Sequence, residues 1–125
     1  MISFETDIPD KELLELMELG NEMGFDPLAS MESEEYFLKL LEKYAPLGEE
    51  KMQAVRKEIE KDFLTFDKPP QWIQGSEWPF FNGKPMYFVG QLDTADNKKA
   101  MPCGLCFYVF WDKETGTIET IAQCD

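Results

Sequence analysis

The spacing of the apolar residues changes once along the chain, and this change restricts the fold more than any other feature. Up to Phe63 the apolar residues recur with helical spacing, whereas beyond Pro69-Pro70 they alternate as in a strand. Twelve of the 17 aromatic residues lie between Phe63 and Trp111. Helices followed by strands indicate the α+β class. We therefore predict a single domain of residues 1–125, with about three helices in 1–66 packed on a mostly antiparallel sheet of about four strands in 67–125.

The helical part contains three segments, predicted at about residues 10–23, 32–45 and 49–64. The first begins at Pro9 or Asp10 and ends at Gly24, because proline suits the first turn of a helix and glycine suits its end. Ser30 or Ser33 is the expected cap of the second. The links between the segments are short, which favours antiparallel neighbours.

The sheet part contains an extended segment at 71–74 and three strands, predicted at 85–93, 104–111 and 117–124. Asn82-Gly83 predicts a tight turn, and residues 112–116 predict a hairpin loop. Uninterrupted alternation in 85–93 places Met86, Phe88, Gly90 and Leu92 on one face and Tyr87, Val89, Gln91 and Asp93 on the other. The strand at 104–111 is apolar on both faces, which predicts a central strand covered on both sides.

The chain carries a net charge of −13, and the charge is concentrated in the helical part. Residues 1–64 hold 17 acidic and 7 basic side chains, a net charge of −10. A surface this negative repels phosphate backbones, so we expect no direct contact with nucleic acid. It favours a basic protein partner, whose approach it would steer; the simpler alternative is that the charge only keeps the protein soluble.

Three observations favour the cytoplasm as the location of this protein. The N-terminal residues lack the basic and apolar regions of a signal peptide. No apolar run approaches the roughly 20 residues of a membrane-spanning helix. Three cysteines cannot all pair within one chain, which favours a reducing compartment.

Histidine is absent from the sequence, and this narrows the possible chemistry. The commonest general base, the usual catalytic triads and the usual zinc-enzyme ligand sets all require it. No phosphate-binding glycine loop is present either. We therefore expect no cofactor and favour a protein that is not an enzyme, although chemistry based on carboxylates alone remains open.

The three thiols permit a weak metal hypothesis. Cys103 and Cys106 form a C-x-x-C pair, and the predicted hairpin brings Cys124 close to Cys106. Structural zinc sites usually combine two such pairs, and here the second is missing. Buried cysteines that act as small apolar residues are the better interpretation, so we predict no metal site.

Aromatic and polar residues are interleaved between residues 72 and 93, and they provide the candidate binding site. The rings either line a groove or seal the core of an irregular, proline-rich segment, and the second interpretation is favoured for each ring. Polar residues among exposed ring edges would favour a binding site. The candidate residues are Trp72, Gln74, Glu77, Trp78, Tyr87, Gln91 and Asp93.

From residue 69 onward the sequence resembles the YwqG-like family of uncharacterised bacterial proteins. The matching features occur in the same order along the chain, over a little under half of its length. They are Pro70-x-Trp72, Glu77-Trp78-Pro79, Gly83-x-Pro85, the run 88–93, the strand 107–111 with its turn at 112–116, and Gln123. Family members typically have two related halves, whereas this chain has a single unit behind its helices.

The resemblance implies an α+β fold built on a mixed or antiparallel sheet, and it implies no established reaction. The Gln91-Leu92-Asp93 strand is also similar to a segment of chaperones that hold a basic ribosomal protein. Relatives of the family look like immunity proteins. Both similarities imply protein binding, and both partner classes are often basic.

Three hypotheses for function follow. The first is a cytoplasmic, non-enzymatic protein-binding module with a basic partner, and it agrees with the charge, the missing histidine and the resemblance. The second is a small-molecule binder or carboxylate-based enzyme centred on Glu77, Gln91 and Asp93. The third is a stable domain whose partner is encoded by a neighbouring gene. The sequence leaves the oligomeric state open.

Overall fold

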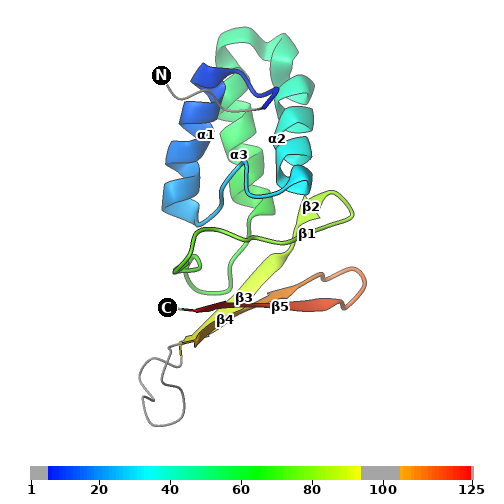
Figure 1. Ribbon diagram of the computed structural model, residues 1–125. Helices are drawn as coiled ribbons and strands as arrows, with labels where there is room; N and C mark the ends of the chain where they lie inside the picture. The colour runs from blue at the N-terminus through cyan, green and yellow to red at the C-terminus, as the bar shows by residue number, and fades with distance from the viewer. Residues whose placement is uncertain (1–5, 94–104, 125) are drawn as a thin grey trace.

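The computed structural model describes residues 6–93 and 105–124, and it confirms the α+β class (Figure 1). The helices come first in the chain and stand on one side of the strands. The helical elements are α1 (Asp10–Met23), α2 (Met31–Tyr44), the 3₁₀ segment η1 (Ala45–Glu50) and α3 (Lys51–Asp62). The strands are β1 (Phe80–Phe81), β2 (Lys84–Pro85), β3 (Tyr87–Asp93), β4 (Leu105–Trp111) and β5 (Ile118–Cys124).

The strands form two antiparallel sheets rather than the single sheet of about four strands that was expected. β1 and β2 pair as a two-stranded hairpin, and β3, β4 and β5 form a three-stranded sheet in that order. The hairpin loop is Asn82-Gly83, with φ of 52° and 78°, as a two-residue turn of this kind requires. Among the described residues, no helix has the length and apolar character needed to cross a membrane.

Local chemistry explains where α1 begins and ends and where α2 begins. α1 follows Pro9, carries Asp10 and Glu12 in its first turn, and ends at Gly24, whose φ is 90° and whose N–H donates to the Gly20 carbonyl at 2.7 Å. Ser30 is the cap of α2, because its Oγ accepts from the Ser33 N–H at 3.0 Å. Ser33 lies inside the helix and donates to the carbonyl of Asp26 at 3.0 Å.

β3 contains a bulge between Phe88 and Gly90, and this changes which side chains face the helices. Phe88 pairs with Phe110, but Gly90 rather than Val89 pairs with Val109. The extra residue reverses the alternation, as a bulge does. The predicted grouping of Gln91 and Asp93 with Tyr87 is therefore wrong. Gln91 and Asp93 instead share the inner face of the sheet, towards the helices, with Phe88.

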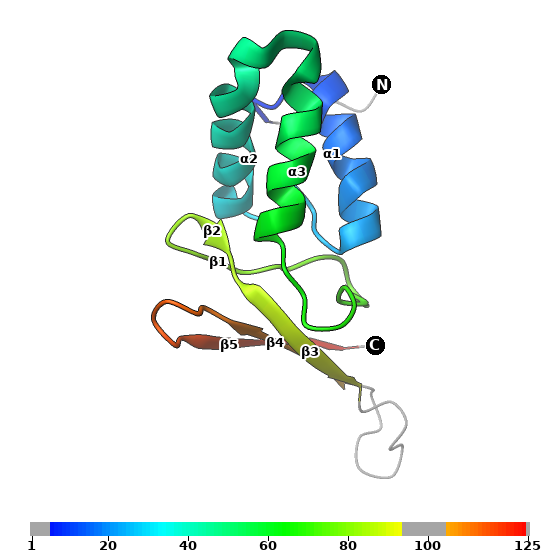
Figure 2. The same cartoon turned by 180° about the vertical axis from the view of Figure 1, so that it is seen from behind.

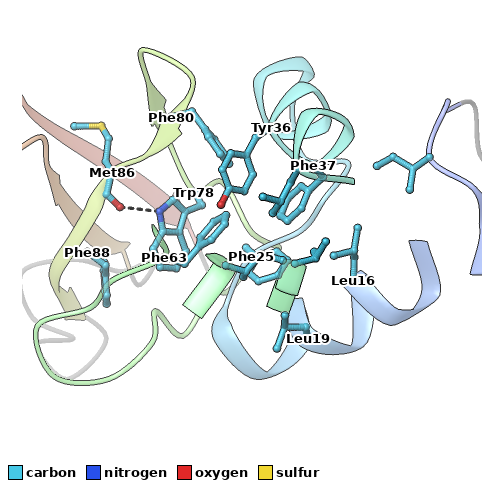
Figure 3. Close-up of a cluster of buried hydrophobic side chains, with 14 of the residues drawn as sticks. Leu16, Leu19, Phe25, Tyr36, Phe37, Phe63, Trp78, Phe80, Met86 and Phe88 are labelled. Carbon is cyan, nitrogen blue, oxygen red and sulfur yellow. Dashed lines mark hydrogen bonds between the residues drawn. The ribbon is translucent and has the colours of Figure 1, made fainter. Parts of the chain in front are cut away.

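The core joins the helices to this inner face, and aromatic rings make most of the contact (Figure 3). Phe63, just after α3, stacks on Phe25 with ring centroids 4.6 Å apart and meets the Trp78 ring edge to face at 5.0 Å. Trp78 reaches in turn to Phe110 of β4, at 5.4 Å. Such pairs add to the free energy of apolar burial. The segment 63–80 therefore connects two layers that are far apart in the sequence.

The prediction that β4 is covered on both faces is wrong for the described part of the chain. β4 is the central strand, and Cys106, Tyr108 and Phe110 on its inner face are buried. Its other face has no helix over it in either view (Figures 1 and 2). Trp111 on that outer face is exposed.

Candidate functional site

Gln123 holds the segment 71–77 against the inner face of the sheet. Its side chain is 1% exposed, and every hydrogen-bonding position of its amide is used. The Oε1 atom accepts from the N–H groups of Ile73 and Gln74, both at 2.9 Å. The Nε2 atom donates to the carbonyl of Gly75 at 2.7 Å and to the carboxylate of Glu77 at 2.8 Å. An irregular segment without strand partners is thereby ordered by one side chain.

Two more inner-face side chains fix the start of the same segment at Gln71. Gln91 accepts from the Gln71 N–H at 2.7 Å, and the Tyr108 hydroxyl donates to the Gln71 carbonyl at 2.9 Å. The amide of Gln91 also contacts the Cys106 sulfur at 3.4 Å. Burial, together with the neighbouring Cys106, raises the pKa of Tyr108, which keeps its hydroxyl protonated as a donor. Gln91 therefore has a structural role.

Trp72 connects this ordered segment to the end of α1. Its ring stacks on Tyr108 with centroids 4.3 Å apart, and its Nε1 atom donates to the carbonyl of Gly24. The Ser76 hydroxyl donates to the same carbonyl at 3.0 Å. The ring is only partly buried, so one part belongs to the core contact and another part remains accessible.

A cavity of about 410 Å³ lies beside Trp72, between the end of α1 and the segment 69–76. We call it the junction cavity. Its lining on the sheet side includes Pro69, Pro70, Gln71, Trp72, Gly75 and Ser76. On the helix side it is lined by Met17, Gly20, Asn21, Glu22, Gly24, Phe25, Asp26 and Pro27. Apolar residues, glycines and polar residues therefore share its wall.

The only charged side chains of the junction cavity's described lining are acidic, Glu22 and Asp26. The carbonyl end of α1, which carries the negative end of the helix dipole, lies in the same wall, and no basic residue occurs in the last turn of α1. Glu22 has only a long contact with Arg56, at 3.7 Å between two exposed side chains. Asp26 uses one carboxylate oxygen to accept from the Leu28 N–H at 2.9 Å. These groups favour a positive charge in the cavity.

The structure separates the predicted site residues into different environments. Trp72 lines the junction cavity, whereas Trp78 is a core residue, 3% exposed, with its Nε1 donating to the Met86 carbonyl at 2.9 Å (Figure 3). Gln74 and Glu77 are exposed residues of the segment that Gln123 orders. Asp93 is exposed at the end of β3, opposite Cys106.

Tyr87 lies elsewhere, on the outer face of the sheet. It borders a second cavity, of about 310 Å³, which we call the lysine-lined cavity; Trp111, three lysines and three acidic residues also line it. The lysines are Lys61, Lys84 and Lys113, and the ammonium of Lys113 lies 4.3 Å from the centroid of the Tyr87 ring. Tyr87 and Trp72 therefore belong to no common groove.

The described thiols do not converge on one point. Cys106 pairs with Gln123 on the inner face and is buried, whereas Cys124 pairs with Leu105 on the outer face and is exposed. Cys103 lies outside the described residues. Within residues 6–93 and 105–124, no group of three metal-ligating side chains comes together.

The carboxylates proposed for an enzymatic site occupy no shared cavity. Neither the junction cavity nor the lysine-lined cavity includes Glu77, Gln91 or Asp93 in its lining. Glu77 and Gln91 are joined to structural amide and backbone groups instead. In the described part of the chain, Glu77, Gln91 and Asp93 are therefore not brought together in either of these two cavities.

Sequence reasoning missed the helix side of the junction cavity. Gly24 was interpreted only as the end of a helix, although it forms part of the cavity wall together with Asp26 and Pro27. A glycine that ends a helix and is followed by Asp-Pro indicates a chain reversal. It does not indicate which other segment packs against that reversal. The Pro69-Pro70 pair was the available signal, because a rigid extended segment often lies along another part of the surface.

Comparison of the chain with protein-family models, with curated proteins and with solved structures gave no match.

Proposed function

We propose that this protein is a non-enzymatic protein-binding module, and that it holds a basic side chain of its partner in the junction cavity. The observation that carries the proposal is the lining of that cavity. An accessible tryptophan and two prolines lie beside Glu22, Asp26 and the carbonyl end of α1, with no basic residue in the described lining. The YwqG-like resemblance, which also implies protein binding, is part of the same proposal.

The chemistry of the cavity suits the two halves of a lysine or arginine side chain. Met17, Pro70 and the ring of Trp72 offer apolar contact to the methylene stem. The carboxylates of Glu22 and Asp26 offer hydrogen-bond acceptors to the charged end. Arginine fits better than lysine, because its planar guanidinium can also stack on an aromatic ring.

The overall charge adds a long-range component. With a net charge of −10 on residues 1–64, the helical part attracts a basic partner before contact. Such steering raises the association rate and weakens with added salt. We place this binding in the cytoplasm, in keeping with the buried thiol of Cys106, which forms no disulfide.

The proposal is tested with fluorescently labelled peptides and anisotropy measurements. An extended arginine-containing peptide is compared with the same peptide carrying glutamine in place of arginine. The decisive variant is Glu22→Gln with Asp26→Asn, which removes both charges while keeping the shapes and the acceptor for Leu28. Its matched control is Glu49→Gln with Glu50→Gln, exposed residues of η1 at the opposite end of the helices (Figure 1).

We expect the cavity variant to weaken binding of the arginine peptide about tenfold and the control to weaken it less than about twofold. Both variants lose the same charge, but only the cavity variant loses the carboxylates that contact the arginine. Equal losses in the two variants would mean that only general charge attraction operates. Failure of the arginine peptide to bind better than the glutamine peptide would reject the basic-partner proposal.

A further inference from the structure

No strand position on the outer face of the three-stranded sheet is charged; the ammonium of Lys113, which follows β4, lies over the Tyr87 ring at one end of the face. The strand register places eleven residues on it: Tyr87, Gly90 and Leu92 of β3; Leu105, Phe107, Val109 and Trp111 of β4; and Ile118, Thr120, Ala122 and Cys124 of β5. In this chain 30% of all residues are charged. Eleven neighbouring positions without one charge therefore form a distinct surface, which we call the outer apolar face.

Large apolar side chains of this face are open to solvent. Ile118 is 66% exposed, Leu92 is 64% exposed and Trp111 is 38% exposed. Phe107 and Val109, on the central strand between them, are partly exposed as well. A continuous exposed apolar surface on a protein is characteristic of an interaction site.

We propose that a second copy of this chain covers the outer apolar face, so that two sheets pack face to face. Packing of two antiparallel sheets through their apolar faces, about 10 Å apart, is a common way to complete a core. A two-fold axis that lies between the two faces and runs perpendicular to the strands would place Trp111 and Ile118 of one copy near Leu92 and Phe107 of the other, because these pairs lie towards opposite ends of the strands. Each copy would then supply the layer that the other lacks.

The distribution of charge favours this occupant. Two chains of net charge −13 repel one another, so they associate best through a surface without charge and with their acidic parts far apart. The helical part, which carries −10, stands on the opposite side of the sheet from the outer apolar face (Figure 2). Face-to-face packing therefore places the two acidic helical layers at the two ends of the dimer.

The size of the face predicts a weak dimer. Three strands of seven residues, at about 4.8 Å between strands and about 3.4 Å per residue, cover a footprint of roughly 350 Å². Stable interfaces bury about 800 Å² on each partner. The dimer is accordingly reversible and forms at high micromolar protein concentration. The junction cavity lies on the helical side and stays open in it, so this inference does not depend on the proposed function.

Sedimentation velocity of the full chain between about 5 and 500 μM tests the proposal. The decisive variant is Leu92→Lys with Ile118→Lys. It replaces two exposed side chains, at opposite ends of the face, by charged ones. Its matched control is Leu14→Lys with Met31→Lys, which changes two exposed apolar residues of the helices. Circular dichroism establishes that each variant is folded.

We expect wild type and control to show the same concentration-dependent dimer, and the face variant to lower the association constant at least tenfold. Added salt strengthens the dimer, since it screens repulsion between the acidic copies. A monomer throughout the concentration range, equal association of the folded face variant, or dissociation by salt would each overturn the proposal. Dissociation by salt would indicate that the two copies associate through ion pairs between lysines of one copy and acidic helices of the other.

Discussion

The side-chain amide of Gln123 donates to the carboxylate of Glu77 at 2.8 Å, between residues 46 positions apart. This contact joins the last strand of the sheet to the segment that runs beneath the helices. Because Gln123 makes three further hydrogen bonds to the backbone of the same segment, it links the C-terminal strand to the junction cavity.

Replacement of Gln123 by alanine should destabilise the protein by about 2–4 kcal/mol, because it removes the four hydrogen bonds of a side chain that is itself buried. Gln74→Ala is the matched control, since the Gln74 side chain is exposed, and should change stability by less than about 0.5 kcal/mol. Urea unfolding monitored by circular dichroism measures both. Similar stability of the two variants would contradict the role assigned to Gln123.

Gly20→Ala should destabilise the protein by at least about 1 kcal/mol, although alanine is the better helix former. A Cβ atom at Gly20 would lie 2.3 Å from the Phe25 carbonyl oxygen, so the chain reversal after α1 would have to move. Gly90→Ala is the control, because its Cβ would meet open space. We expect a change of less than about 0.5 kcal/mol there. Thermal unfolding compares the two, and a gain in stability for Gly20→Ala would refute the close approach.

Trp72→Phe should mainly weaken binding, whereas Trp78→Phe should mainly lower stability. Trp78→Phe removes a buried hydrogen bond to Met86 and leaves a void, so we expect a loss of about 2–3 kcal/mol in the free energy of unfolding. Trp72→Phe removes a hydrogen bond at a partly exposed site and should cost about 1 kcal/mol.

Binding of the arginine peptide should weaken in the Trp72→Phe variant and stay unchanged in folded Trp78→Phe, because only Trp72 lines the junction cavity. Anisotropy titrations under conditions where both variants are fully folded measure this. A loss of binding in Trp78→Phe alone would place the site elsewhere.

Glu58 should make the stability of the helical layer depend on pH. Burial acts to raise its pKa, but hydrogen bonds from Lys43 at 2.8 Å and from the Tyr44 hydroxyl at 2.6 Å outweigh it and lower the pKa. A carboxyl whose pKa is lower in the folded state stabilises the protein above its unfolded pKa of about 4.3, and this contribution is lost as the pH falls through the folded pKa.

Wild type should therefore be more stable than Glu58→Gln at pH 7, and this difference should disappear as the pH is lowered from about 5 to 3. Urea unfolding of both proteins at each pH gives the comparison. A difference that stays constant over this range would show that the Glu58 charge does not contribute.

Several parts of the fold follow from the sequence because their causes are local. Gly24 ends α1 with a positive φ, and Asn82-Gly83 forms the two-residue turn that its composition predicts. The change from helical to strand spacing at Pro69-Pro70 predicted the α+β class, since both periodicities depend on residues a few positions apart. Of the seven predicted site residues, Trp72 alone is part of the described lining of the junction cavity.

Only the tertiary structure decided whether each candidate residue lies in the core, in a cavity wall or on a surface. Uninterrupted alternation in β3 was assumed, but pairing with β4 inserts a bulge and turns Gln91 and Asp93 to the inner face. Trp72 and Trp78 have similar sequence surroundings, yet one lines a cavity and the other lies in the core, because α1 ends beside the first and Phe63 packs on the second. Gln123 acquires its role only from backbone groups some 50 positions away. Local chemistry determined the elements of this protein, and contacts between distant segments determined its surfaces.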